Sequence, residues 1–289
     1  MKGWVKALLP AFSVLIASQA IAGVGKNIFE LTNSGSFAEL VGELTQGSLL
    51  RGRVPAGSEV CFNEQALAVT PDGQFVFGIG RDAPLQHELT IRHPDGTDSI
   101  ALQFSARSYD IQHVEGVAQR YVTPPPEVLD RIRQDSAAVR QARNVQSELS
   151  YVFTQPVWPA YGRISGVYGS QRIFNGVPRN PHYGLDIAGP TGSPVYAPWS
   201  GVVTLAKDLY YSGLTLIVDH GYGVSSTLMH LDAFHVNVGD KIEQGQLVAD
   251  MGASGRVTGP HLDWRINWYQ ERLDPALLMP EAAPPKHQP

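Results

Sequence analysis

Short β-rich runs between glycine turns limit what this chain can fold into more than any other feature. Runs at 202–206, 214–218 and 223–228 are rich in Val, Leu, Ile and Thr, and glycines separate them. This spacing is typical of strands that follow one another through tight turns. The pattern predicts a C-terminal domain of antiparallel β-sheet over residues 153–278.

A second strand-rich pattern covers residues 27–122. Its runs mix apolar and polar residues at strand spacing, and sequences with turn chemistry separate them. The runs lie at 48–54, 74–79 and 88–92, and the turns lie at 71–73 and 93–96. We therefore predict a small N-terminal β-sandwich. Its histidines, His87, His93 and His113, occur singly and are interpreted as ordinary surface or core residues.

A connector at 123–150 separates the two β regions. It begins with Thr123-Pro124-Pro125-Pro126, which ends strand structure and fixes the backbone. Residues 127–147 then carry good helix formers with no glycine or proline, and apolar residues recur near helical spacing. The expected fold is thus mainly β, with one helical connector between the domains.

The two ends of the chain have their own character. Residues 1–22 combine a basic start with an apolar run that closes on Ala20-Ile21-Ala22, which is typical of a cleavable secretory signal. An uncleaved membrane anchor is the alternative, and the small residues at 20 and 22 argue against it. No later stretch is apolar for long enough to cross a bilayer. We expect an exported protein of the periplasm, with a loose proline-rich tail at 279–289.

Charge and cysteine content narrow the function classes. The formal net charge is −5 at pH 7, which does not favour nucleic acid as a partner because nucleic acid requires basic surface. The sole cysteine, Cys61, excludes an intramolecular disulfide and leaves either a buried thiol or an intermolecular bridge. No G-x-S-x-G elbow and no phosphate-cradling loop with its lysine occurs.

Two pairs of histidine and aspartate carry the chemistry. Pro181 and Gly184 disfavour a helix around His182, so we expect His182 and Asp186 on one face of an extended strand. His261 and Asp263 share a face for the same reason. Together the pairs predict a divalent-metal site, in which zinc would activate a water and polarise a carbonyl for hydrolysis. A structural cation site, and histidines that bind no metal, remain open.

Three longer stretches resemble a known family. They are NPHYGLDIAGPTGSPVYAPWSGVV at 180–203, IVDHGYGVSSTLMHL at 217–231 and VGDKIEQGQLVADMGASGRVTGPHLDW at 238–264. In order and spacing they resemble the lysostaphin-type (LytM-like) zinc metallopeptidases, which cut peptide cross-links of peptidoglycan. The resemblance covers about 162–275. It implies a core of antiparallel sheet, of the duplicated hybrid motif type, with the metal in a groove lined by loops.

The resemblance also implies roles for single residues. His182 and Asp186 match the family's H-x-x-x-D pair and would be metal ligands. His230 and His261 match histidines that assist catalysis. Asp263 stands where the family has its third ligand, a histidine. A His-Asp-Asp set would still accept zinc, although its additional carboxylate would favour Mn²⁺ or Mg²⁺ more than the usual set does.

The function expected from this resemblance is a zinc-dependent endopeptidase acting on peptidoglycan peptides. The alternative is a catalytically inactive relative that binds cell wall or activates other cell-wall hydrolases. A sugar-transport phosphocarrier is a third class, and the secretory signal argues against it because such carriers need a cytoplasmic phosphate donor. Tyr210 could line the groove, although a packed aromatic is the simpler interpretation. The sequence does not assign a role to the first domain.

Overall fold

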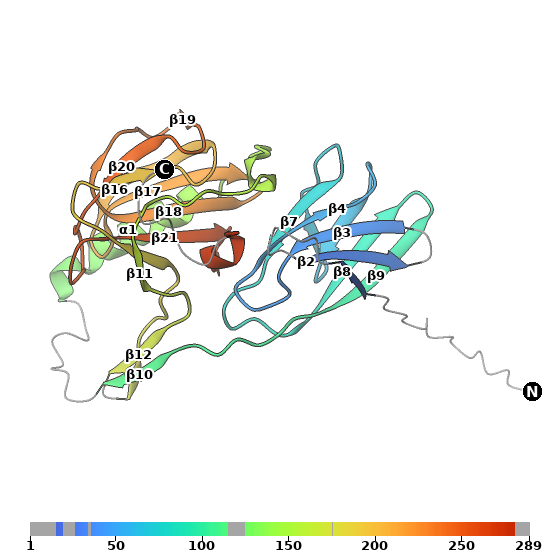
Figure 1. Ribbon diagram of the computed structural model, residues 1–289, viewed down its shortest axis with the longest axis horizontal. Coiled ribbons are helices and arrows are strands. Elements are labelled where there is room, and N and C mark those ends of the chain that lie inside the picture. The colour runs from blue at the N-terminus through green and yellow to red at the C-terminus, as the bar shows by residue number, and fades with distance from the viewer. Residues whose placement is uncertain (1–15, 20–26, 34–35, 115–124, 175, 281–289) are drawn as a thin grey trace, which may run out of the picture.

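The computed structural model describes residues 16–19, 27–33, 36–114, 125–174 and 176–280. Figure 1 shows two strand-rich lobes, so the prediction of a mainly β chain is confirmed. Most of the expected signal at 1–22 and of the expected tail at 279–289 lies outside the described residues. Of the first segment only β1 (Ile16–Gln19) is described, and it pairs with β2 (Asn27–Asn33).

The N-terminal lobe is a β-sandwich of two antiparallel sheets. The first has the order β1-β2-β3-β4-β7, and the second has the order β6-β5-β8-β9. The remaining strands are β3 (Ser36–Gly42), β4 (Leu49–Arg53), β5 (Glu59–Phe62), β6 (Gln65–Leu67), β7 (Gln74–Gly78), β8 (Gln86–His93) and β9 (Gly96–Gln103). The three runs noted in the sequence thus form β4, β7 and β8.

Alternating apolar residues fill the space between these sheets. Leu50, Phe75 and Phe77 are fully buried, as strand periodicity requires for one face of β4 and β7. Gly52 lies opposite Phe75, and a Cβ at position 52 would be 2.0 Å from the Phe75 ring. A glycine in the middle of a strand therefore makes room for an aromatic ring of the core.

The C-terminal lobe is built on one large antiparallel sheet. Its main path has the order β11-β14-β21-β18-β17-β16-β19, and β15, β20 and β22 pair alongside it. The strands are β11 (Arg163–Gly166), β14 (Leu185–Ala188), β15 (Pro194–Tyr196), β16 (Gly201–Leu209), β17 (Gly213–Gly221), β18 (Val224–Phe234), β19 (Lys241–Ile242), β20 (Leu247–Met251), β21 (His261–Trp268) and β22 (Glu271–Leu273). The glycine-punctuated runs thus form β16, β17 and β18.

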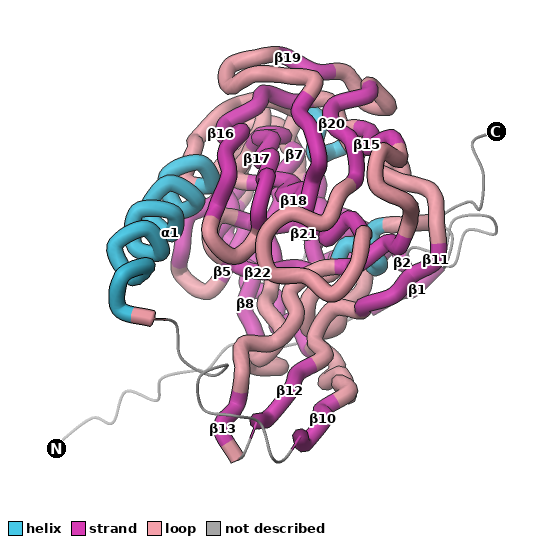
Figure 2. The backbone as a smooth tube through the Cα atoms, turned by 90° about the vertical axis from the view of Figure 1, so that its left-hand side faces the viewer, coloured by secondary structure: helices cyan, strands magenta, loops and turns pink. Residues whose placement is uncertain are grey.

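One α-helix covers part of this sheet. The stretch expected as helical at 127–147 forms a 3-10 turn (Pro126–Val128) and then α1 (Leu129–Arg143). Val139 and Ala142 of α1 pack against Leu205 and Ile217 of the sheet. Figure 2 shows α1 lying along β16. Two further 3-10 turns lie at Tyr151–Phe153 and Pro275–Leu278.

A small three-stranded sheet joins a strand that follows the N-terminal lobe to two strands of the C-terminal half, and it lies at the bottom of Figure 1. β10 (Ile111–Val114) pairs in parallel with β12 (Gln171–Phe174), and β12 pairs with β13 (Val177–Pro178). Figure 1 shows β10 at the end of a long arm that leaves the N-terminal lobe. β10 falls within the range expected for the first domain, yet its strand partner belongs to the C-terminal half of the chain.

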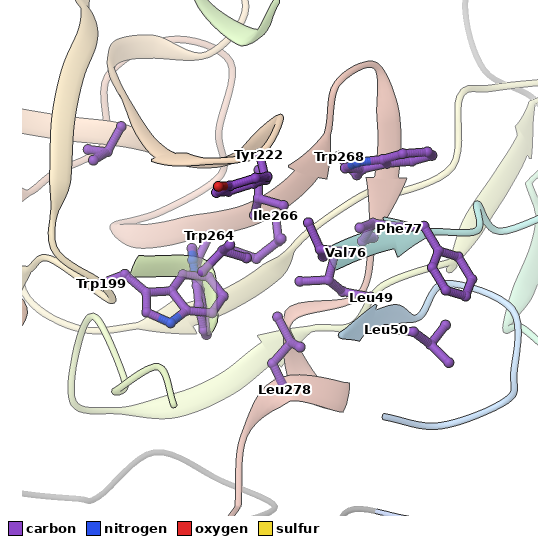
Figure 3. Close-up of a cluster of buried hydrophobic side chains, with 14 of the residues drawn as sticks. Leu49, Leu50, Val76, Phe77, Trp199, Tyr222, Trp264, Ile266, Trp268 and Leu278 are labelled. Atoms are coloured by element: carbon purple, nitrogen blue, oxygen red, sulfur yellow. The ribbon is translucent and has the colours of Figure 1, made fainter. Parts of the chain in front are cut away.

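Apolar packing runs from one lobe into the other. Figure 3 shows Leu49 and Val76 of the sandwich in one buried cluster with Trp264, Ile266 and Leu278 of the C-terminal lobe. Hydrogen bonds cross the same boundary, because the amide of Asp274 donates to the carbonyl of Gly47 at 2.8 Å. The lobes therefore share a core where they meet.

Candidate metal centre

Strand pairing brings the two histidine and aspartate pairs together. β14 and β21 are antiparallel neighbours, and their register places Asp186 directly opposite Asp263 and Ala188 opposite His261. Side chains directly opposite on two strands lie on the same face of the sheet. The two carboxylates that are 77 positions apart in the sequence are thus cross-strand neighbours.

His182 reaches the same place from a loop. The prediction that His182 shares a strand with Asp186 is wrong, because β14 begins only at Leu185. The loop is held by two backbone hydrogen bonds: the amide of His182 donates to Ser170, and the amide of Gly169 donates to the carbonyl of His182. These bonds to a neighbouring loop replace the strand ladder.

The distances within this group are short. His182 Nε2 lies 3.1 Å from Asp186 Oδ1, and His182 Nδ1 lies 3.9 Å from Asp263 Oδ2. Burial alone lowers the pKa of His182, but the adjacent carboxylates outweigh burial and raise it above its ordinary value. The site thus concentrates negative charge around one imidazole.

Glycines allow the backbone to approach the carboxylates. A Cβ at Gly166 would lie 2.2 Å from Asp186 Oδ2, and a Cβ at Gly184 would lie 2.1 Å from Asp263 Oδ1. No other residue type fits at these two positions without moving a carboxylate. The glycine of the H-Y-G-L-D stretch therefore has a packing role beside the site.

The donor set fits a divalent cation. His182, Asp186 and Asp263 each offer one ligand atom, and these atoms lie within 4.8 Å of one another. His182 Nε2 and Asp186 Oδ1 are buried, and neither has a hydrogen-bond partner among the described residues. Two buried polar atoms that face each other without a partner are expected where a metal ion binds.

Arg265 is a residue of the site that the sequence reasoning missed. It donates from Nη2 to Asp263 Oδ2 at 2.6 Å and from Nε to Asp263 Oδ1 at 3.0 Å. Burial by itself would raise the pKa of the Asp263 carboxyl, but Arg265 holds it below its ordinary value. Strand alternation could have revealed this pair, because Arg265 is two residues after Asp263 on β21.

His230 and His261 complete the group. The Nδ1 atoms of His230 and His261 lie 2.9 Å from the carbonyl oxygens of Ser254 and Gly259, so both donate from Nδ1 and leave Nε2 as an acceptor. The two rings lie 4.9 Å apart, and His261 Nε2 is 3.9 Å from Asp186 Oδ1. Burial lowers the pKa of His230, which favours its neutral form. Both can therefore accept a proton beside the carboxylates.

The other histidines of the C-terminal lobe have structural partners. His220 is fully buried, and His235 Nε2 lies 3.0 Å from Asp250 Oδ1. Tyr210 lies beside α1, where its amide donates to Asp135 and its side chain lines a cavity of about 310 Å³. In the N-terminal lobe, Cys61 is a free, half-buried thiol on β5.

Comparison with known proteins gives consistent results for this lobe. Residues 180–275 match the model of peptidase family M23. The peptidoglycan DD-endopeptidases ShyB and ShyA of Vibrio cholerae are each 36% identical, over 112 and 105 residues. These alignments cover 38% and 36% of this chain but only 26% and 24% of those proteins, so the chain matches about a quarter of their length.

A solved structure resembles most of the chain. It is described as a candidate M23 peptidase of Pseudomonas aeruginosa, and it is 26% identical with a TM-score of 0.64. The match covers 82% of this chain and 95% of that protein, and therefore includes both lobes. Taken with the strand order, the histidine and aspartate pairs and the family match, these findings assign the C-terminal lobe to peptidase family M23 as a LytM-like domain.

Proposed function

We propose that this protein is a metal-dependent endopeptidase that hydrolyses peptide cross-links of peptidoglycan. The observation that carries the proposal is the pair of buried, unpartnered atoms, His182 Nε2 and Asp186 Oδ1, which lie 3.1 Å apart beside two further histidines. The DD-endopeptidase relatives support peptidoglycan peptides as the substrate class.

His182, Asp186 and Asp263 would hold the ion. A divalent cation bound there would polarise the scissile carbonyl and lower the pKa of a water. We propose zinc, with Mn²⁺ as the alternative because two of the three ligands are carboxylates. Arg265 balances the charge on Asp263, so the Asp263 and Arg265 pair carries no net charge, like the neutral imidazole that the family has at this position.

The remaining steps belong to His230 and His261. Each keeps Nε2 as an acceptor because a backbone carbonyl holds the proton on Nδ1. His261 Nε2 faces Asp186, so it is placed to accept a proton from the attacking water. His230 lies behind it at ring-contact distance and is suited to orient the substrate or pass the proton to the leaving amine.

The protein would act outside the cytoplasm. The apolar run near the start of the sequence supports export, and peptidoglycan lies beyond the inner membrane. Within the described ranges, no helix combines the length and the apolar character needed to cross a bilayer.

One observation favours a second function. Arg265 engages both oxygens of Asp263, and a carboxylate that is already paired with a guanidinium is a weaker metal ligand. The second candidate is therefore a non-catalytic LytM-like protein that binds peptidoglycan or activates other cell-wall hydrolases.

Metal analysis together with digestion of muropeptides separates the two candidates. For the enzyme we expect one zinc or manganese ion per chain and cleavage of cross-linked muropeptides, with both lost after chelation. Absence of bound metal and of cleavage after loading with zinc and with manganese would exclude the enzyme and leave the second candidate.

Substitutions at Asp263 test the third ligand. Asp263→Ala is expected to lower metal affinity by more than about tenfold, because loss of an outer-shell partner alone costs that much. Asp263→His should retain the metal. Since Asp263→Ala also leaves the half-buried Arg265 without its carboxylate partner, Asp263→Asn serves as the fold-preserving comparison, with the melting temperature measured for each variant. Full metal occupancy in Asp263→Ala, at a melting temperature close to that of Asp263→Asn, would show that Asp263 is not a ligand.

A further inference from the structure

The polar face of β21 continues beyond the metal centre. Asp263, Arg265 and Asn267 alternate along one face of this strand. Strand pairing places Ser225 of β18 and Arg272 of β22 directly opposite Asn267. The face that carries the carboxylate of the site therefore leads into a second group of polar side chains.

Helix α1 contributes a buried arginine to this second group of polar side chains. Arg143, in the last turn of α1, is 4% exposed and donates from Nη2 to Thr227 Oγ1 at 3.2 Å. Thr227 lies opposite Arg265 in the pairing of β18 with β21. The guanidinium of Arg143 thus lies over the strands beside Arg265. We call the group formed by Arg143, Ser225, Asn267 and Arg272 the arginine cluster.

The arginine cluster is short of hydrogen-bond partners. Five of its buried atoms have none within the part of the chain that the structure describes: Arg143 Nε and Nη1, Ser225 Oγ, Asn267 Oδ1 and Arg272 Nη1. A buried donor left without a partner costs about 1–3 kcal/mol, and more when it is charged. Several such atoms in one place indicate a missing ligand.

The charge of the cluster is also unbalanced. Burial lowers the pKa of Arg143 well below its ordinary value, and the neighbouring Arg272 and Arg265 lower it further. Burial likewise lowers the pKa of Arg272 to about 10, with Arg265 adding to the effect. The nearby carboxylate, Asp263, is already paired with Arg265. An anion would offset the charge and accept hydrogen bonds from the arginine nitrogens and the Ser225 hydroxyl, whereas Asn267 Oδ1 is itself an acceptor and needs a donor.

The other acidic side chains near the cluster make their contacts elsewhere. Asp135 accepts from the amide of Tyr210 and lies 3.4 Å from Lys207 Nζ. The Glu271 carboxylate lies beside Gly80 of the N-terminal lobe, where a Cβ at position 80 would be 2.6 Å from its Oε2. Among the described residues, neither Arg143 nor Arg272 forms an ion pair with a carboxylate within 4.0 Å, so both guanidinium groups can bind an external anion.

Two cavities give access to the cluster. One of about 690 Å³ lies between the lobes, the other of about 310 Å³ lies beside α1, and both are lined by Gln270 and Arg272. The larger cavity is also lined by Tyr183, which directly follows His182 in the chain. The Arg272 guanidinium lies 5.8 Å from the centre of the Tyr183 ring. The larger cavity thus reaches the residue that follows His182 in the chain and extends from there to Arg272.

We infer that Arg272 and Arg143 form a binding site for a carboxylate of the peptide substrate. The inference rests on the proposed function for the identity of the substrate. Guanidinium groups bind carboxylates with strong, charge-assisted hydrogen bonds. The site selects peptides with a free carboxylate near the scissile bond and orients them relative to His182.

Direct binding tests the site without cleavage. The probe is N-acetyl-D-alanyl-D-alanine, titrated calorimetrically into the full chain in the presence of a chelator. We expect binding and a rise in melting temperature, and neither effect with the C-terminal amide of the same peptide. Inorganic phosphate is the second probe. Stabilisation by phosphate with none by the peptide would overturn the assignment to a peptide carboxylate. Because the chelator removes metal, failure of the proposed metal chemistry does not affect this result.

Arg272→Met and Arg143→Met locate the site. Each variant should weaken peptide binding by at least about tenfold, since a hydrogen bond to a charged group contributes enough for that factor. Each should also raise the melting temperature of the free protein, because one of two repelling buried cations is removed. Arg92→Met, at a residue 61% exposed in the N-terminal lobe, is the matched control and should change neither quantity. A lower melting temperature with unchanged peptide binding in both variants would show that the arginines are only structural.

Discussion

At the scale of residues, the charge of the candidate site depends on the contacts of the Asp263 carboxylate with Arg265 and His182. Asp263 is buried between Arg265, which donates to both of its oxygens, and His182, whose Nδ1 lies 3.9 Å away. A carboxylate oxygen has two lone pairs: Oδ2 accepts from both Nη2 and Nε of Arg265, whereas Oδ1 accepts only from Nε and retains a lone pair for a metal ion. The paired guanidinium reduces the charge of the ligand set from −2 to −1, which is the value of a set with two histidines and one aspartate.

His220 gives a residue-scale prediction about pH. It is fully buried, its Nδ1 donates to the Ser200 carbonyl, and its Nε2 accepts from Ser226. Burial lowers the pKa of His220 to about 4. As the pH falls, His220 therefore becomes protonated near pH 6.5 in the unfolded chain but only near pH 4 in the folded chain. Stability should fall as the pH falls through this window, by roughly 3 kcal/mol in total.

Urea unfolding between pH 7 and pH 4 measures this loss. His220→Gln retains a donor and an acceptor but does not titrate, so this part of the pH dependence should disappear. His113→Gln is the control, because His113 is exposed on β10. An equal pH dependence in wild type and His220→Gln would show that other groups are responsible.

At the scale of elements, strand alternation explains where pattern reasoning succeeded and failed. β21 is a regular strand, so the spacing of His261 and Asp263 correctly predicted that their side chains share a face. The segment before β14 is a loop whose backbone bonds to residues 169 and 170, so spacing predicted nothing about His182. Residue spacing predicts the direction of side chains only within a regular strand or helix. The conformation of a loop depends on the residues that contact it in space.

Helix α1 gives a prediction at this scale. Its Asp135 is 8% exposed, accepts from the Tyr210 amide at 2.8 Å and lies near Lys207. Asp135→Ala is expected to cost about 1–3 kcal/mol and to lower amide-exchange protection along α1, because the helix loses its polar attachment to the end of β16. Asp130→Ala, at an 81% exposed residue of the same helix, should change stability by less than about 0.5 kcal/mol. Unchanged exchange in Asp135→Ala would mean that apolar packing alone holds α1.

At the scale of the whole molecule, the N-terminal lobe contacts the loop that carries His182. Arg81 of this lobe is buried, donates from Nε to the Gly169 carbonyl at 2.9 Å and lies 4.3 Å from the Tyr109 ring centre. The amide of Gly169 in turn donates to the His182 carbonyl at 2.7 Å. One short chain of contacts thus runs from the first lobe to a residue of the site.

Arg81→Met tests this connection. The substitution leaves the Gly169 carbonyl without its charged donor, so the loop that holds His182 should loosen and metal affinity should fall by about tenfold. Competition with a coloured chelator measures the affinity, and circular dichroism checks the fold. Arg53→Met, at a residue 58% exposed in the same lobe, is the control. Equal affinities in the two variants would show that the C-terminal lobe holds His182 by itself.

The sequence by itself determined the class of fold, six of the strands and the residue types of the candidate site. Apolar alternation and glycine turns are local properties, so they identified β4, β7, β8 and β16 to β18, and the motif around His182 and Asp186 identified the family. Only the tertiary structure decided that Arg81 supports His182 and that Arg143 lies beside Arg272. Arg81 and Arg143 are brought to these contacts by segments far away in the sequence. Their buried charges interact strongly because water is excluded, and no local pattern encodes that exclusion.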